Sequence, residues 1–185
     1  MNWANQILEE IFDEETLITP RQGVYILGLS QFVAAVISMW AVTRFGRKTL
    51  LLFGHAGSFI LLFMLALCLA FDYHGLTLTL ICAYAFVFNV SNATVVNVYL
   101  VEVCTDIALG AAMVVMQLII LLETSSALYI INWFGAAGFF FMYSVFSLAG
   151  FIFIYNYVGE TMNLTDKEKL MLYHPGQKYG AKALP

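Results

Sequence analysis

Residues 43–57 read TRFGRKTLLLFGHAG, and they place three basic residues within five positions before running into apolar sequence. Only eight Lys and Arg residues occur among the 185 residues of the chain. Another long apolar run precedes this stretch. A short basic segment between two long apolar runs is typical of a loop that joins membrane-spanning helices.

The composition of the whole chain indicates the same class of protein. Hydrophobic residues make up 62% of the chain, charged residues 11%, and the mean hydropathy is +0.85. A soluble domain averages about 25% charged and about 45–50% apolar residues. We therefore expect most of the chain to lie in the lipid bilayer, which is thus an expected partner.

Five apolar runs have the length of a membrane-spanning helix, which needs about 20 residues. A transmembrane barrel would instead show alternating segments of about ten residues, and the sequence has none. The sequence thus predicts an all-α, polytopic transmembrane helix bundle over residues 22–158. Its five complete spans are expected at about 22–43, 49–71, 76–101, 107–131 and 134–158.

The basic residues are divided unevenly between the two sides of the membrane that five alternating spans define. Arg21 is alone on the side of the amino-terminal segment, and seven lie on the other side: Arg44, Arg47, Lys48, Lys167, Lys169, Lys178 and Lys182. Lys and Arg prefer the cytoplasmic side in short loops and near helix ends. We expect the amino terminus outside and the carboxyl terminus in the cytoplasm, with the plasma membrane as the location. The net charge of −4 says little about partners, because five of the twelve acidic residues lie together in Glu9–Glu15, but the lack of a basic patch argues against a nucleic-acid partner.

The two ends of the chain have separate predictions. Residues 1–21 are predicted to hold the end of a preceding helix, since apolar residues recur at helical spacing up to residue 13, and then an outside segment. Residues 159–185 are predicted as a cytoplasmic tail with a short helix that begins at the capping box TDKE, Thr165–Glu168. The three cysteines lack metal-ligand spacing and no catalytic motif is present, so no metal, cofactor or enzymatic activity is expected.

Four motifs in register resemble the sugar porters of the major facilitator superfamily. The RFGRK segment, residues 44–48, resembles the family's D-R-x-G-R-R/K loop, and the helix before it matches without a gap from Gly28. YLVEV places Glu102 on the family's Y-x-x-E-I/V motif, and VGETMNLTDKE places Glu160 on its P-E-T-K-G-L-T motif. The opening ANQILEEIF is similar to the end of the family's seventh helix. The resemblance covers the whole chain and implies the carboxyl-terminal half: the end of helix seven plus helices eight to twelve.

The family resemblance implies a gate on the cytoplasmic face. Arg44 and Arg47 would pair with Glu102 and Glu160 when the inner gate closes. A network of charges at helix ends can form and break with small conformational shifts. The alternative is that the basic residues only fix the orientation of the chain in the membrane.

Polar residues inside the predicted spans are candidates for a substrate pathway, since an unpaired polar group in hydrocarbon is costly. At 100° per residue, Asn89, Asn92 and Tyr99 fall within an arc of roughly 80° on the third span. Gln31 lies in the first span and Gln117 in the fourth. Asn97 aligns with the family's sugar-stacking Trp. The alternative for each of these residues is an interhelical hydrogen bond with no ligand.

Glu123 is the only acidic residue deep inside a predicted span, about 12 Å from the outer end of its helix. A carboxylate within the membrane is by default a candidate functional group. Glu123 could therefore bind a proton or cation that drives uptake. The alternative is a protonated acid that is hydrogen-bonded to a neighbouring helix, or one that reaches the outer water.

The chain departs from the family pattern at several positions, and the departures leave the substrate open. They include Thr43 for Asp, Leu109 for Arg, Gly159 for Pro, Met162-Asn163 for Lys-Gly, and Ile120-Leu121 for Asn-Trp. The gate motifs are thus partly kept, whereas much of the family's sugar site is replaced.

The resemblance implies a membrane transporter, here its carboxyl-terminal half, that moves a sugar or a similar small solute by alternating access. Two alternatives stay open: a transport-inactive half-length relative that serves as a structural or interaction subunit, and a proton-coupled carrier of a non-sugar solute. The expected partner is a missing amino-terminal half or a second membrane subunit. We expect residues 1–185 alone to insert in the membrane but to transport nothing, because a substrate cavity forms between two halves.

Overall fold

The computed structural model describes residues 20–71 and 73–173, and this part of the chain is helical without any strand. A 3-10 helix, η1 (His74–Leu76), precedes α4, and a π-helix, η2 (Asn89–Ala93), joins α4 to α5. The expected all-α bundle is therefore confirmed, whereas the helix end expected at residues 1–13 lies outside the described residues. The α-helices are α2 (Pro20–Arg44), α3 (Arg47–Ala70), α4 (Thr77–Phe88), α5 (Thr94–Val103), α6 (Asp106–Tyr157) and α7 (Asp166–Met171).

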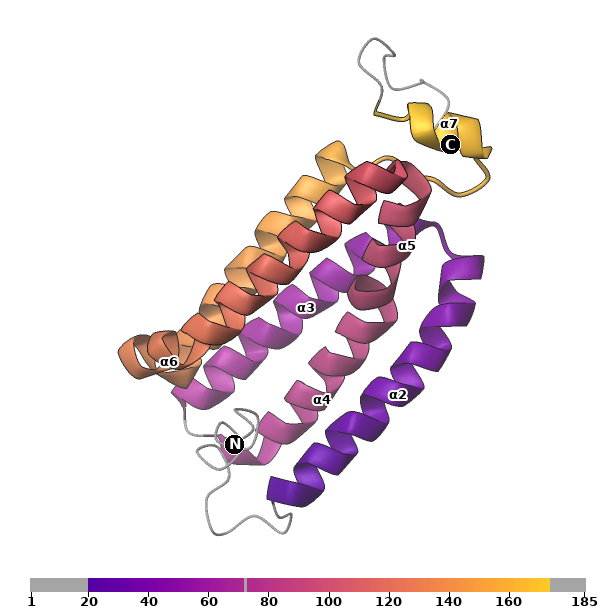
Figure 1. Cartoon of the computed structure of the whole chain (residues 1–185). Coiled ribbons are helices and arrows are strands. Elements are labelled where there is room, and N and C mark those ends of the chain that lie inside the picture. Colours follow the sequence, from indigo (N-terminus) through magenta and orange to yellow (C-terminus); the bar gives the residue numbers. More distant parts are fainter. Residues whose placement is uncertain (1–19, 72, 174–185) are drawn as a thin grey trace.

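Four helical stretches in the described residues are long and apolar enough to cross a membrane: Tyr25–Arg44, Arg47–Ala70, Thr77–Val103 and Asp106–Tyr157. The last has 52 residues and would be about 78 Å long if straight, against about 30 Å of hydrocarbon. It is not straight, because Gly135 takes φ 70° and ψ 169° and α6 folds back there into two arms that run side by side (Figure 1). The break expected at Asn132-Trp133 thus lies at Gly135, whose backbone conformation is essentially restricted to glycine.

Helix α3 lies at the centre of the bundle, packed against α4 and α6, while α2 packs on α4 and η2 (Figure 1). The Ser144 hydroxyl on the second arm of α6 donates a hydrogen bond to the Phe59 carbonyl of α3 at 3.3 Å. Apolar burial joins α2, α3, α5 and α6 near the start of α3. This core consists of Ala41, Val42, Leu50, Leu51, Val95 and Ile154.

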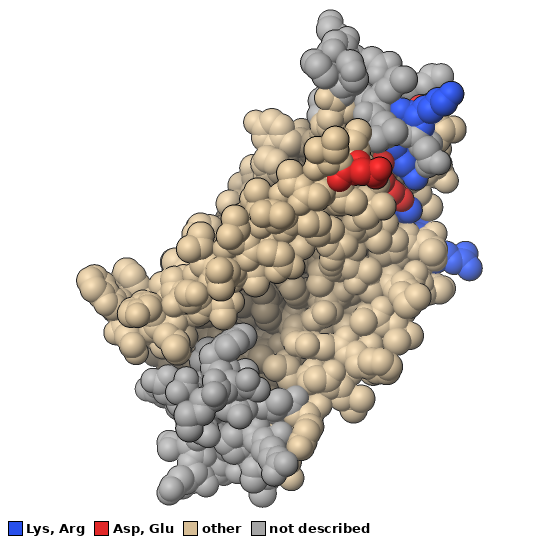
Figure 2. Space-filling view, in the orientation of Figure 1, with Lys and Arg blue, Asp and Glu red and all other residues tan. Residues whose placement is uncertain are grey.

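On the face drawn in Figure 2, the charged side chains gather at one end of the bundle. Large apolar side chains stand exposed along both arms of α6, including Ile107 at 89% and Trp133 at 84%. A soluble protein rarely exposes contiguous apolar patches of this extent. The faces of the bundle are therefore suited to lipid or to another membrane-spanning segment.

Candidate functional site

The charged end of the bundle consists of residues 44–48, 102–106 and 158–173, and it brings together three separate parts of the chain (Figures 1 and 2). Helices α2 and α3 are joined by only two residues, Phe45-Gly46. This short link fixes Arg47 at the first turn of α3. Helix α7 lies against the end of α5.

Glu102 is the centre of this charged end. Its Oε1 accepts a hydrogen bond from Arg47 Nη2 at 2.7 Å and lies 3.5 Å from Lys169 Nζ. Its Oε2 accepts a hydrogen bond from the Thr161 hydroxyl at 2.6 Å. The side chains of Arg47, Glu102 and Lys169 are only 18%, 14% and 16% exposed. One carboxylate thus joins α3, α5, α7 and the segment before α7 through charge-assisted contacts that are largely withdrawn from water.

Glu160 has a different role, because it binds backbone rather than a basic side chain. Its carboxylate accepts hydrogen bonds from the backbone N–H of Arg47 at 2.8 Å and of Lys48 at 3.1 Å. These are the first residues of α3, whose N–H groups have no partner within the helix. The same carboxylate accepts the N–H of Thr161 and of Met162. Glu160 therefore caps α3 from a segment more than one hundred residues away, with its negative charge at the positive end of the helix dipole.

Gly46 makes this cap possible. It is the N-cap residue of α3 and has no side chain of its own to bind the free N–H groups. A Cβ atom at this position would collide with the Glu160 carboxylate. The glycine thus leaves the space that the carboxylate occupies.

Tyrosine hydroxyls hold the segment that carries Glu160 in place. The Tyr99 hydroxyl donates a hydrogen bond to the Gly159 carbonyl at 3.1 Å and lies 2.6 Å from the Tyr173 hydroxyl. The Gly159 N–H in turn donates to the Tyr173 hydroxyl at 3.2 Å. A capping box is present at Thr165 and Glu168 at the start of α7. Hydrogen bonds from the Thr165 hydroxyl and N–H lower the pKa of Glu168.

This arrangement differs from the expected pairing in two respects. Arg44 is exposed at the end of α2 and forms no ion pair with any residue that the structure describes. Arg47 forms one of the expected ion pairs, with Glu102, but it meets Glu160 only through its backbone N–H. Thr161 and Lys169 were missed by the sequence reasoning. Thr161 could have been found, because it lies next to Glu160 within the quoted GET motif; the structure buries it fully.

Asn92 lies inside the bundle rather than on an open face. It is 6% exposed and packs with Ser91 against Gly54 of α3. The Ser38 hydroxyl of α2 donates a hydrogen bond to the Val90 carbonyl of η2 at 2.8 Å. The Asn89 amide donates to the Ala85 carbonyl at 2.8 Å. The π-helix thus meets α2 and α4 through hydrogen bonds, and α3 through the close approach of Gly54.

The other candidate pathway residues lie apart from Asn92. Gln31, Asn97 and Gln117 are exposed on α2, α5 and the first arm of α6. Asn97 donates a hydrogen bond to the Ala93 carbonyl one turn earlier, at 2.8 Å. The structure therefore places these side chains on three helices without bringing them into one site with Asn92.

Glu123 is exposed on the first arm of α6 and lies beside Tyr143 of the second arm. It is 12 residues before Gly135, or about 18 Å along the helix axis. Because α6 continues to Gly135, Glu123 lies deeper than its predicted distance of about 12 Å from the helix end. Within the described residues, no group of three or more His, Cys, Asp or Glu side chains could hold a metal ion.

The sequence profile of the family described as "Sugar (and other) transporter" matches residues 1–169 of the chain. No curated protein and no solved structure is a significant match. The match to the family profile includes the charged end up to Lys169. The chain belongs to this sugar transporter family. It is accordingly a multi-pass membrane protein of the major facilitator superfamily, and the family is one of transporters rather than of enzymes.

One departure from the sugar transporter motif is explained by the backbone. Asn163, which stands where the P-E-T-K-G-L-T motif has Gly, takes φ 63°. Asn is among the few non-glycine residues that adopt this left-handed conformation readily. The turn between Glu160 and the capping box of α7 therefore keeps the shape that the motif requires, although the glycine is replaced.

Proposed function

We propose that this chain forms the carboxyl-terminal half of a transporter that moves a sugar or a similar small solute by alternating access. In this proposal α2, α3, the α4–η2–α5 unit and the two arms of α6 are five spans. The charged end is the inner gate and faces the cytoplasm, and the plasma membrane is the expected location. The observation that carries the proposal is the network around Glu102 in a chain of the sugar transporter family.

The network has the properties of a latch that can open. A single exposed ion pair contributes only about 0–1 kcal/mol, whereas a hydrogen bond to a charged group contributes about 1.5–3 kcal/mol. Glu102 combines two basic partners and one hydroxyl from separate segments. A total of a few kcal/mol is enough to hold one conformation and is small enough for ligand binding to reverse.

A second six-helix half completes the transporter in this proposal, because the substrate site lies between the two halves. The exposure of Gln31, Asn97 and Gln117 supports it. Exposed amide side chains within the membrane are costly unless protein or water covers them. A second half would supply that cover and the opposite wall of the pathway.

The test is hexose uptake by cells that lack their own hexose transporters and produce the chain together with its natural second half. We expect saturable uptake, which Arg47→Ala reduces several-fold while the amount of protein in the membrane stays the same. Arg44→Ala is the matched control and should change uptake much less, because Arg44 has no ion pair among the described residues. Equal effects of the two substitutions would leave Arg47 as an orientation signal only.

The need for a second half is tested with the purified chain in liposomes, with and without a proton gradient. We expect the chain alone to insert without catalysing uptake. Saturable hexose uptake by a monomer of residues 1–185 would refute this part of the proposal. Uptake of a non-sugar solute that depends on the gradient would favour a proton-coupled carrier.

A further inference from the structure

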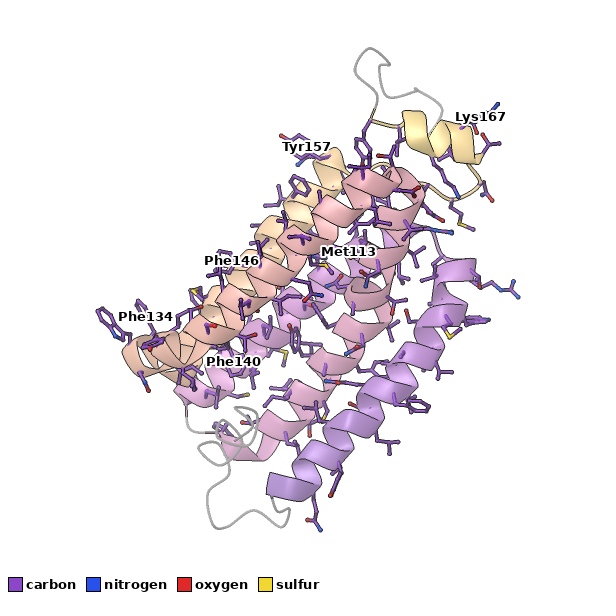
Figure 3. The ribbon with its side chains drawn as sticks, in the orientation of Figure 1. Met113, Phe134, Phe140, Phe146, Tyr157 and Lys167 are labelled. Carbon is purple, nitrogen blue, oxygen red and sulfur yellow. The ribbon has the colours of Figure 1, made fainter. Side chains whose placement is uncertain are left out.

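The surroundings of Glu123 form a site that the gate does not use. Glu123 and Ser126 of the first arm of α6 share a cavity of about 520 Å³ with Tyr143 and Phe146 of the second arm. Phe146 lies about halfway along that arm (Figure 3). The Ser126 hydroxyl already donates a hydrogen bond to the Leu122 carbonyl at 2.8 Å. Among the residues that line this mostly apolar cavity, only Glu123 carries a formal charge.

Aromatic rings lie beside this carboxylate in the cavity. Tyr143 and Phe146 of the second arm line the same cavity as Glu123. The Tyr143 ring packs on Phe139 at a centroid distance of 4.6 Å and on Phe146 at 6.4 Å. These ring contacts hold Tyr143 and Phe146 in position in the cavity that contains Glu123.

None of the Lys and Arg side chains that the structure places lies near Glu123. The five Lys and Arg side chains that the structure describes all belong to the charged end: Arg44, Arg47, Lys48, Lys167 and Lys169. Glu123 is 17 residues along α6 from Asp106, or about 26 Å from that end. A carboxylate at this depth needs a partner, because an unpaired charge in hydrocarbon is costly.

The chemistry of the cavity selects among possible partners. Hard metal ions need about six oxygen ligands, and the cavity offers one carboxylate and two hydroxyl groups. A sugar needs several polar contacts, which an apolar wall does not supply. A large cation with an apolar surface instead gains from burial of that surface, from the aromatic rings and from the carboxylate.

We propose that the cavity between the two arms of α6 binds a lipophilic organic cation, such as a quaternary ammonium or phosphonium ion, with Glu123 as its counter-ion. Tyr143, which lines the same cavity, offers its ring to the cation. The site lies away from the charged end, so the proposal does not depend on sugar transport.

The experiment measures the binding of radiolabelled tetraphenylphosphonium to the purified full chain by a scintillation proximity assay. We expect saturable binding to the wild-type chain and an affinity at least about tenfold lower for Glu123→Gln, the loss expected when a desolvated cation loses its counter-ion. Tyr143→Phe should weaken binding less. Asp106→Asn is the matched control, because it removes a carboxylate from the same arm at its charged end, and it should bind like the wild type.

A second measurement needs no variant and so does not depend on how a substituted chain folds. Methyltriphenylphosphonium and triphenylphosphine oxide have similar shapes, but only the first carries a net charge, so the oxide should compete at least about tenfold less well than the cation. Equal competition by the two compounds would show that apolar burial alone drives binding. Either that result or unchanged affinity in a folded Glu123→Gln chain would overturn the proposal.

Discussion

The cap that Glu160 places on α3 makes a quantitative prediction for Glu160→Ala. The substitution leaves the first N–H groups of α3, at Arg47 and Lys48, without their acceptor. Loss of a helix cap costs about 0.5–2 kcal/mol, and loss of a negative charge at a helix amino terminus costs about 0.3–1 kcal/mol. The N–H groups within the segment of Glu160 lose the same acceptor. We expect the free energy of unfolding to fall by about 2–4 kcal/mol in total.

Glu160→Gln separates the hydrogen bonds from the charge. The amide keeps one acceptor oxygen, so this variant should lose only about 1 kcal/mol. Gly46→Ala should disrupt the same cap, because the Cβ of the alanine would collide with the Glu160 carboxylate. If the two residues act through one contact, Gly46→Ala should cost at least about 0.5 kcal/mol less in the Glu160→Ala background than in the wild type.

The assay is equilibrium unfolding of the purified chain in mixed micelles, titrated with a denaturing detergent and followed by the fluorescence of its tryptophans. Unfolding by titration and refolding by dilution should give the same midpoints. Additive effects of Gly46→Ala and Glu160→Ala would refute the cap as we describe it. An unfolding free energy of Glu160→Ala within about 0.5 kcal/mol of the wild type would do the same, since surface substitutions usually stay within that range.

Two further predictions concern the orientation of the chain and the turn in α6. Cys104 lines a cavity of about 850 Å³ next to the charged end. In a chain whose other two cysteines are replaced by serine, we expect Cys104 to react in intact cells much faster with a membrane-permeant maleimide than with an impermeant one. Rapid labelling by the impermeant reagent would place the charged end outside. Gly135→Ala should lower the free energy of unfolding by about 1–3 kcal/mol, because alanine resists this positive φ, whereas Gly110→Ala, in open space on the same arm, should raise it by up to about 1 kcal/mol. Equal effects of the two glycine substitutions would mean that the turn imposes no backbone constraint.

The helical architecture could be predicted because it depends on properties that sequence shows directly. Run length and the absence of charge predict a spanning helix, and the basic cluster at Arg44–Lys48 marks the link between α2 and α3. The capping box at Thr165 and Glu168 is a local pattern of two residues. None of these features needs knowledge of which helices are neighbours.

The remaining features depend on contacts or on single backbone angles, and sequence patterns could not place them. The polar pair Asn132-Trp133 suggested a loop, but helical hydrogen bonding continues until Gly135 changes the backbone direction. Asn92 is predicted to line a pathway, and that role stays a prediction; its burial against Gly54 is a contact that the sequence does not show. Glu160 was predicted to meet an arginine side chain, and only the three-dimensional arrangement shows that it binds the start of a helix instead.

The π-helix also changes the angular positions predicted for the polar residues of this span, because counting at 100° per residue assumes an unbroken α-helix. Asn89 and Asn92 lie within η2, whereas Tyr99 lies beyond it in α5. Hydrogen bonds from residue i to i+5 take up one residue more than those of an α-helix. Tyr99 is consequently turned toward Gly159 and Tyr173 at the charged end.

The same π-helix sets a rule for changes of chain length. Removing one residue within Asn89–Ala93 would restore ordinary α-helical spacing and leave the flanking helices α4 and α5 in their present phase. Removing one residue elsewhere in α5 before Glu102 would rotate that side chain by about 100° around the helix, away from Arg47. This five-residue window can thus absorb a deletion that would separate Glu102 from Arg47 if it fell elsewhere in α5. Related chains that are one residue shorter in this span should therefore carry the gap here.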